Sequence, residues 1–157
     1  MLEVNNLRTR IAQEAMSLVG QHGRNHPGNN EDHTIGRSPE TGFDCSGLIL
    51  YIFGMVGLTI PNDLRHTSEL FDHFGIFAHQ GREGDLVFFS KEGLAPKHVG
   101  IMVSNREYVH RKGDTVEIAE LKVTKIPIRR QNQLYRLNPI GFKILSIQNG
   151  RWKTIVE

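Results

Sequence analysis

The chain has 157 residues, a formal net charge of +2 and 38% hydrophobic residues, which fits one globular domain and excludes a disordered or fibrous protein. No window reaches the roughly 18 consecutive apolar residues of a membrane span, and the first residues lack the apolar segment of a secretory signal peptide. We therefore expect a cytoplasmic protein, or one exported by a route that needs no such signal.

The first half of the chain predicts helices separated by loops. Apolar residues recur at three- and four-residue spacing over residues 5–18, which predicts a packing helix. Residues 21–42 are rich in Gly, Asn and His and predict a long loop. A strongly apolar helix is expected between Asp44 and Gly57, and a shorter one over residues 62–74.

The second half predicts short strands of β-branched and aromatic residues separated by turn residues. They are expected at residues 84–89, 98–103, 107–111, 115–121 and 134–137. Because the helices come first and the strands afterwards, the predicted fold class is α+β, with the helices gathered on one side of an antiparallel sheet.

A final hairpin is expected at the C-terminus. Its strands would cover residues 142–147 and 151–156, on either side of Asn149-Gly150, a dipeptide that favours a tight hairpin turn. We expect residues 1–140 to form one domain and residues 141–157 to pack on it as an extension. A plain packing role, such as an extra sheet layer, is favoured over a dimer contact or a partner-binding edge.

Cys45 is the one cysteine of the chain, so neither an intrachain disulfide nor a multi-cysteine zinc site can form. It follows Asp44 at the expected start of the apolar helix. Free backbone N–H groups and the helix dipole stabilise a thiolate there, so we expect a lowered thiol pKa and a nucleophilic cysteine. The alternative is a small buried side chain at the start of a core helix.

A nucleophilic cysteine needs a base, and the base needs a group that fixes its tautomer. His98 and His110 lie on two consecutive predicted strands. With residues 103–105 as the loop, Gly100 would face Tyr108 and His98 would face His110, on one side of the sheet. A two-residue loop would instead place the histidines on opposite faces.

Four motifs in this order resemble the NlpC-type cell-wall cysteine peptidases, a papain-like family that cleaves peptide links in peptidoglycan stems. The motifs are Phe43-Asp44-Cys45-Ser46-Gly47-Leu48, Gly84-Asp85-Leu86-Val87-Phe88-Phe89, His98-Val99-Gly100-Ile101 and Tyr108-Val109-His110. The resemblance covers about residues 8–137. It implies that Cys45 is the nucleophile, His98 the general base and acid, and His110 the residue that orients His98.

The resemblance also implies a papain-like fold and a reaction that requires no metal or organic cofactor. The substrate carbonyl would acylate Cys45, His98 would protonate the leaving group, and water would hydrolyse the thioester. The backbone N–H of Cys45 is the expected oxyanion donor. The substrate would be peptidoglycan or a muropeptide, and the bond most often cleaved in this family links γ-D-glutamate to a diamino acid.

Substrate-binding residues are implied by the same resemblance. Asp44 and Ser46 are expected near the amine end of the substrate. Asp32 and His33 stand where many members carry a tyrosine and paired glycines, so we expect recognition of the stem peptide's end to differ. Arg65 lies in a polar run that often borders the cleft in this family, with a solvated helix face as the alternative.

Two further groups of polar residues suggest sites that we do not expect to exist. His66, Glu69 and His73 have helical spacing, but no third histidine or cysteine lies at ligand spacing, so a metal site is not expected. The basic stretch from Lys122 to Arg136 lacks aromatic interleaving and matches no nucleic-acid motif. We expect a solvated basic face there and no nucleic-acid partner.

Three functions fit these residues. The leading one is a hydrolase that cleaves an amide bond in peptidoglycan stem peptides. An amidase, or an acyl or amide transferase, would use the same thioester. A catalytically degenerate module that only binds wall peptides would explain the altered segment at residues 32–36, but the presence of Cys45, His98 and His110 argues against it. The sequence makes no prediction about oligomeric state.

Overall fold

The computed structural model describes residues 2–25, 35–58, 64–78, 80–90, 96–121, 138–144, 147–148 and 151–152. The helices are α1 (Leu2–Ser17), α2 (Cys45–Met55) and α3 (Thr67–His73). The strands are β1 (Arg37–Ser38), β2 (Gly42–Phe43), β3 (Ile76–Ala78), β4 (Leu86–Ser90), β5 (His98–Met102), β6 (Glu107–Lys112), β7 (Thr115–Glu120), β8 (Asn138–Ile144), β9 (Ile147–Gln148) and β10 (Arg151–Trp152). In this part of the chain, no helix is long and apolar enough to cross a membrane.

The predicted helices are found with shifted ends. The largest shift is in α3, which begins at Thr67 instead of residue 62. The start is fixed by a capping box, in which the backbone N–H of His66 donates to Glu69 Oε1 at 2.9 Å. Since a capping box satisfies backbone donors that would otherwise lack partners, it defines where this helix starts.

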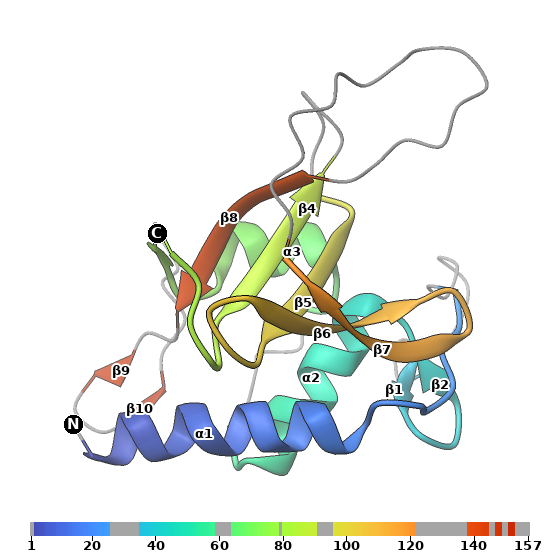
Figure 1. The fold of residues 1–157 in the computed structure, drawn as a ribbon, viewed down its shortest axis with the longest axis horizontal. Coiled ribbons are helices and arrows are strands. Elements are labelled where there is room, and N and C mark those ends of the chain that lie inside the picture. Colours follow the sequence, from blue (N-terminus) through green and yellow to red (C-terminus); the bar gives the residue numbers. More distant parts are fainter. Residues whose placement is uncertain are drawn as a thin grey trace.

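A six-stranded antiparallel sheet forms the centre of the fold, in the strand order β3-β8-β4-β5-β6-β7 (Figure 1). Side chains from all three helices pack in one core with the inward-facing side chains of β4 to β7. The predicted α+β architecture, with helices packed on an antiparallel sheet, is therefore confirmed.

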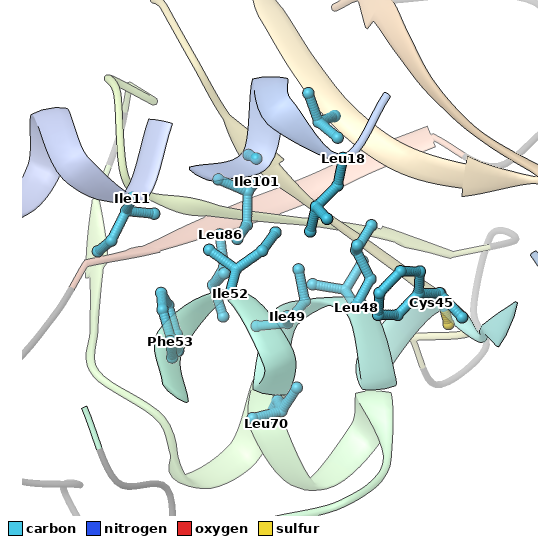
Figure 2. Close-up of a cluster of buried hydrophobic side chains, with 14 of the residues drawn as sticks. Ile11, Leu18, Cys45, Leu48, Ile49, Ile52, Phe53, Leu70, Leu86 and Ile101 are labelled. Carbon is cyan, nitrogen blue, oxygen red and sulfur yellow. The ribbon is translucent and has the colours of Figure 1, made fainter. Parts of the chain in front are cut away.

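Helix α2 lies at the centre of this core. Its side chains Ile49, Ile52 and Phe53 are fully buried, with α1, α3 and the sheet around them (Figure 2). Burial of each such side chain contributes roughly 1.5–3 kcal/mol. Other helices and the sheet cover α2 on several sides, and this burial explains why the helix is apolar around most of its surface. This packing holds the first residue of α2, Cys45, in a fixed position.

The predicted register between β5 and β6 is wrong by two residues. Met102 pairs with Tyr108 and Ile101 with Val109, so the loop consists of residues 104–106. Ser104 explains this choice, because its Oγ accepts the backbone N–H groups of Arg106 at 3.1 Å and Glu107 at 3.0 Å. A shift of two residues preserves the face of every side chain. His98 and His110 therefore still lie on one face of the sheet.

The C-terminal part adds a strand to the central sheet. β8 pairs with both β3 and β4, and it covers residues 138–144 where a strand over 142–147 was expected. The expected domain boundary after residue 140 falls within β8. Its register with β4 shifts between Phe88 and Phe89, beside Pro139, which has no N–H to donate to the ladder.

A short hairpin follows β8 in the chain. β9 and β10 pair antiparallel on either side of residues 149–150, which confirms the predicted hairpin, although both strands are shorter than expected. The predicted strand over residues 134–137 lies outside the described residues.

The segment expected as a long loop, residues 21–42, contains regular pairing. β1 pairs with β2, and His22 and Gly23 form bridges with Thr115 and Phe43. These contacts tie the chain before Cys45 to the end of the β6-β7 hairpin. They place three segments that are distant in sequence around the start of α2.

Candidate active site

Cys45 is the first residue of α2, as the sequence predicts. Asp44 caps the helix, and its Oδ1 accepts the backbone N–H of Gly47 at 2.7 Å. The preceding residue is held as well, because the N–H of Phe43 donates to the carbonyl of His22 at 2.9 Å. The cap and this pairing fix the backbone on both sides of the thiol.

The thiol of Cys45 is buried, with an exposed fraction of 6% for the residue. Its Sγ lies 3.3 Å from Thr67 Oγ1 and 3.8 Å from the carbonyl oxygen of Lys97. Burial raises the pKa of the thiol, while the Thr67 hydrogen bond and the positive charge of Arg111 act in the opposite direction. The expectation of a lowered thiol pKa is therefore wrong for this state, because burial outweighs the helix N-terminus.

His98 and His110 form a direct hydrogen bond. His98 Nε2 lies 2.7 Å from His110 Nδ1. Gly100 makes this approach possible, since a Cβ at that position would lie 2.9 Å from Tyr108 Cδ2 and 3.3 Å from His110 Cβ. The ring of Tyr108 packs against His110, with ring centroids 4.7 Å apart. The aromatic neighbour and the glycine together fix the position of the second ring.

Both imidazoles are uncharged near neutral pH. Burial lowers the pKa of His98 to about 3, and the nearby His110 and Arg111 act in the same direction. Burial also lowers the pKa of His110 to about 4, with contributions from Lys112 and Arg111. Cys45 is thus a neutral thiol beside two neutral histidines, and His98 is free to accept a proton.

The hydrogen bond between the histidines determines which nitrogen of His98 serves the thiol. Its Nε2 is used by His110, so Nδ1 is the nitrogen left for proton transfer. If Nδ1 accepts a proton, Nε2 carries its own and donates to His110 Nδ1, and His110 then carries a proton on Nε2. Among the described residues, the buried His110 Nε2 has no hydrogen-bond partner, so no acceptor in that part of the chain opposes or fixes this tautomer.

The structure brings Cys45 close to His98 without joining them. In the part of the chain that is described, the polar contacts of Sγ are with Thr67 and with the Lys97 carbonyl, which is bonded to the backbone nitrogen of His98. Proton transfer therefore requires Sγ to come within hydrogen-bonding distance of His98 Nδ1.

Asp44, Ser46 and Arg65 form a buried network behind the nucleophile. Arg65 donates to Asp44 Oδ2 at 2.6 Å, Asp44 Oδ1 at 3.1 Å and Ser46 Oγ at 2.9 Å. It also donates to the carbonyl of Ile35 at 3.0 Å. The exposed fractions of Asp44, Ser46 and Arg65 are 0%, 0% and 3%. These three side chains contact one another, and their substrate-binding role stays a prediction.

The remaining predicted substrate residues, Asp32 and His33, lie outside the described residues. His66, Glu69 and His73 have the helical spacing that suggested a possible metal site. In the structure, Glu69 instead caps α3 by accepting the backbone N–H of His66. Over the described ranges, no group of three or more His, Cys, Asp or Glu side chains is arranged to hold a metal ion.

The sequence did not predict the roles of three further residues. Thr67 contacts the nucleophile, Gly100 admits His110, and Arg111 contributes a positive charge that acts on Cys45, His98 and His110. Thr67 belongs to the polar run beside Arg65 that the resemblance places at the border of the cleft, but its contact with the thiol was not predicted. Gly100 lies within the motif that contains His98, and its role could have been predicted by considering which side chains of the next strand lie over it. The role of Arg111 depends on segments that meet only in the folded chain.

Comparison with known proteins agrees with this geometry. The profile of the NlpC/P60 family matches residues 28–132. The chain is 38% identical over 90 residues to the murein DD-endopeptidase MepH of Escherichia coli, covering 55% of this chain and 33% of MepH. It is 37% identical over 89 residues to the bifunctional muramidase/DL-endopeptidase CwlT of Bacillus subtilis, covering 55% of this chain and 26% of CwlT.

A solved structure supports the same assignment. The crystal structure of an NLP/P60 family protein similar to lipoprotein, from Staphylococcus aureus, has a TM-score of 0.60 and 26% sequence identity, covering 88% of this chain and 41% of that one. The chain spans a third or less of the two curated relatives. The match of the family profile to most of the chain, with the fold and the order of Cys45, His98 and His110, shows that the protein belongs to the NlpC/P60 family of papain-like fold.

Proposed function

We propose that this protein is a cysteine endopeptidase that cleaves an amide bond in peptidoglycan stem peptides, at the link between γ-D-glutamate and a diamino acid. The observation that carries the proposal is the placement of a buried thiol at a capped helix N-terminus, next to the start of β5, whose His98 is hydrogen-bonded to His110 of β6. MepH and CwlT, both named as endopeptidases, support peptidoglycan as the substrate.

The first half of the reaction forms the thioester. The Cys45 proton passes to His98 Nδ1 as Sγ attacks the substrate carbonyl carbon. The carbonyl oxygen becomes an oxyanion, for which the N–H of Cys45 is the donor, because the first N–H groups of a helix have no intrahelical partner. His98 then gives its proton to the leaving amine, and the carbon–nitrogen bond breaks.

The second half reverses these roles. Water loses a proton to His98 Nδ1 and attacks the thioester carbon. The carbon–sulfur bond breaks, and the proton returns to the Cys45 sulfur. His110 holds His98 throughout by the hydrogen bond to Nε2, which keeps Nδ1 directed at the reacting atoms. Because the thiol and the imidazole start neutral, the proton moves as the carbon–sulfur bond forms.

The bond cleaved is a separate part of the proposal. The two curated relatives are named for different specificities, a DD-endopeptidase and a DL-endopeptidase, so similarity to them supports endopeptidase activity more strongly than any one bond. The γ-D-glutamyl link is proposed from the motif resemblance. A soluble substrate would fit a cytoplasmic recycling role, and intact sacculi would fit action on the wall after export.

Digestion of purified sacculi and of soluble stem peptides tests the proposal. We expect wild-type protein to produce new termini at the γ-D-glutamyl link, identified by mass spectrometry, and Cys45→Ala to produce none. A primary amine added to the reaction tests the transferase alternative. If the protein is a transferase, this amine should be incorporated into the product. Binding of stem peptides by both proteins without cleavage by either would contradict the proposal and favour a wall-peptide binding module.

A further inference from the structure

Arg111 is a cation beside the catalytic machinery that the reaction above does not use. It follows His110 on β6, so its side chain leaves the opposite face of the strand. That face carries Val109, which packs in the same core as Cys45 and α2. The residue that orients the base and a guanidinium on the nucleophile's side of the sheet are thus neighbours in the chain.

The Arg111 side chain packs beside a segment that precedes α2. Its aliphatic part lies against Gly23, where a Cβ would be 2.7 Å from Arg111 Cγ and 2.8 Å from Cδ. Gly23 forms a bridge with Phe43, two residues before Cys45. A side chain at position 23 would displace Arg111, so this glycine keeps the path of the arginine open.

The guanidinium of Arg111 has unused donors. In the described part of the chain, its one hydrogen bond runs from Nη1 to the carbonyl of Gly113, at 3.0 Å. Its Nε is buried and has no hydrogen-bond partner within the described ranges. None of the ion pairs found among the described residues includes Arg111. A buried donor without a partner is costly, and an anion that binds there would remove this cost.

The charge of Arg111 reaches the reacting groups. It opposes the effect of burial, which raises the pKa of the Cys45 thiol, and it adds to the effect of burial in lowering the pKa of His98 and of His110. Arg111 also directly follows His110 on β6, so an anionic group held by its guanidinium would lie near the histidine pair. Within a substrate, such a group belongs next to the scissile bond and not at a distant end.

We propose that Arg111 is a specificity-determining residue that binds a free carboxylate flanking the scissile amide. The proposal rests on the proposed function. A glutamyl residue linked through its γ-carboxyl keeps its α-carboxylate free, and a diamino acid on the other side can carry a second carboxylate. The planar guanidinium matches a carboxylate with two parallel hydrogen bonds. Both sources have the same chemistry, and the test separates them.

The test compares substrates that differ in one charge. Three soluble stem peptides are needed: one with both carboxylates free, one with the glutamyl α-carboxylate as a carboxamide, and one with the diamino acid carboxylate as a carboxamide. We expect wild-type kcat/KM to fall about tenfold or more for one of the two amides, equivalent to about 1.4 kcal/mol. The amide that loses activity identifies the carboxylate that Arg111 binds.

Variants of the full chain then assign the effect to Arg111. We expect the acid-to-amide ratio of kcat/KM to fall to within about twofold of one in Arg111→Gln, mainly through KM, and to be partly retained in Arg111→Lys. Arg106→Gln removes an equal charge at the exposed 104–106 turn, and we expect it to keep the wild-type ratio. Equal cleavage of acid and amides by wild type, or a wild-type ratio in Arg111→Gln, would overturn the proposal.

Binding to Cys45→Ala separates this proposal from the proposed function. Calorimetric titration of the same three peptides into Cys45→Ala, with and without Arg111→Gln, measures carboxylate recognition without catalysis. A preference for the free acid that disappears with Arg111→Gln supports the site even if wild-type protein cleaves nothing. Equal affinity for acid and amides contradicts it. Circular dichroism checks that each variant is folded. If Arg111→Gln is not, a reduced preference for the free acid in Arg111→Lys supports the site, and an unchanged preference contradicts it.

Discussion

Two groups of polar side chains lie near Cys45, and they differ in how fully their hydrogen-bonding atoms are used. In the network of Asp44, Ser46 and Arg65, both carboxylate oxygens accept bonds from the arginine. In the pair of His98 and His110, one ring nitrogen is buried and has no partner in the part of the chain that the structure describes. A satisfied network favours one fixed arrangement, whereas a pair with an unused nitrogen keeps the capacity to hold or move a proton.

Residues that lie close together in sequence differ in their roles at this site. Asp44 and Ser46 flank the nucleophile, yet their polar atoms face Arg65 and the helix N-terminus. We infer that they hold the backbone at Cys45 in place, while the histidines perform the chemistry. Variants that weaken one group should therefore affect stability, and variants that weaken the other should affect the rate.

The largest effect is expected from the network. Arg65→Leu leaves the carboxylate of Asp44 buried without its partner, so the free energy of unfolding should fall by about 3–5 kcal/mol. Urea denaturation at pH 7 measures it, with Arg106→Leu on the exposed turn as the control. A loss below about 1 kcal/mol would show that the network contributes little to the fold and would remove the contrast with the histidines.

His110→Ala should produce the opposite pattern. Without its partner, the ring of His98 loses the bond that directs Nδ1, so kcat should fall on the order of 10²- to 10³-fold. The free energy of unfolding should change by less than about 2 kcal/mol. His110→Gln keeps an acceptor and should recover part of kcat, which a purely structural loss would not. Wild-type kcat in His110→Ala would exclude the positioning role.

The sequence predicts the features of this site that depend on local pattern. The start of the apolar helix at Cys45 follows from Asp44 and the apolar run, and the shared face of His98 and His110 follows from strand alternation. The register of β5 and β6 is wrong because the hydroxyl of Ser104 determines the turn. The raised thiol pKa and the pairing of Arg65 depend on burial and on segments that meet only in the folded chain.

The pH dependence of stability distinguishes the histidine pair from the network. In the unfolded chain both histidines bind protons near pH 6.5, whereas in the fold their pKa values are about 3 for His98 and about 4 for His110. Their contribution is complete above pH 6.5 and is lost as the pH falls toward 4. We expect a loss of up to about 2–3 kcal/mol between pH 7.5 and 5.5.

Urea denaturation at several pH values measures this loss, over a range in which most carboxylates stay ionised. The double variant His98→Gln, His110→Gln should flatten the pH dependence. An unchanged slope in that variant would assign the effect to groups elsewhere and would remove the distinction between the pair and the network.

The smallest effect is expected at Thr67, which contacts the sulfur of Cys45 itself. Its hydroxyl, 3.3 Å from Sγ, stabilises the thiolate and opposes the effect of burial on the Cys45 pKa. Thr67→Val keeps the shape of the side chain and removes this bond, so alkylation of Cys45 near neutral pH should slow by about the value of one hydrogen bond, roughly 1 kcal/mol or about fivefold. Thr67→Ser keeps the hydroxyl and should alkylate at nearly the wild-type rate. Equal rates in Thr67→Val and wild type would mean that the thiolate is stabilised by the helix N-terminus and Arg111 alone, and Thr67 would then belong with the packing of α3.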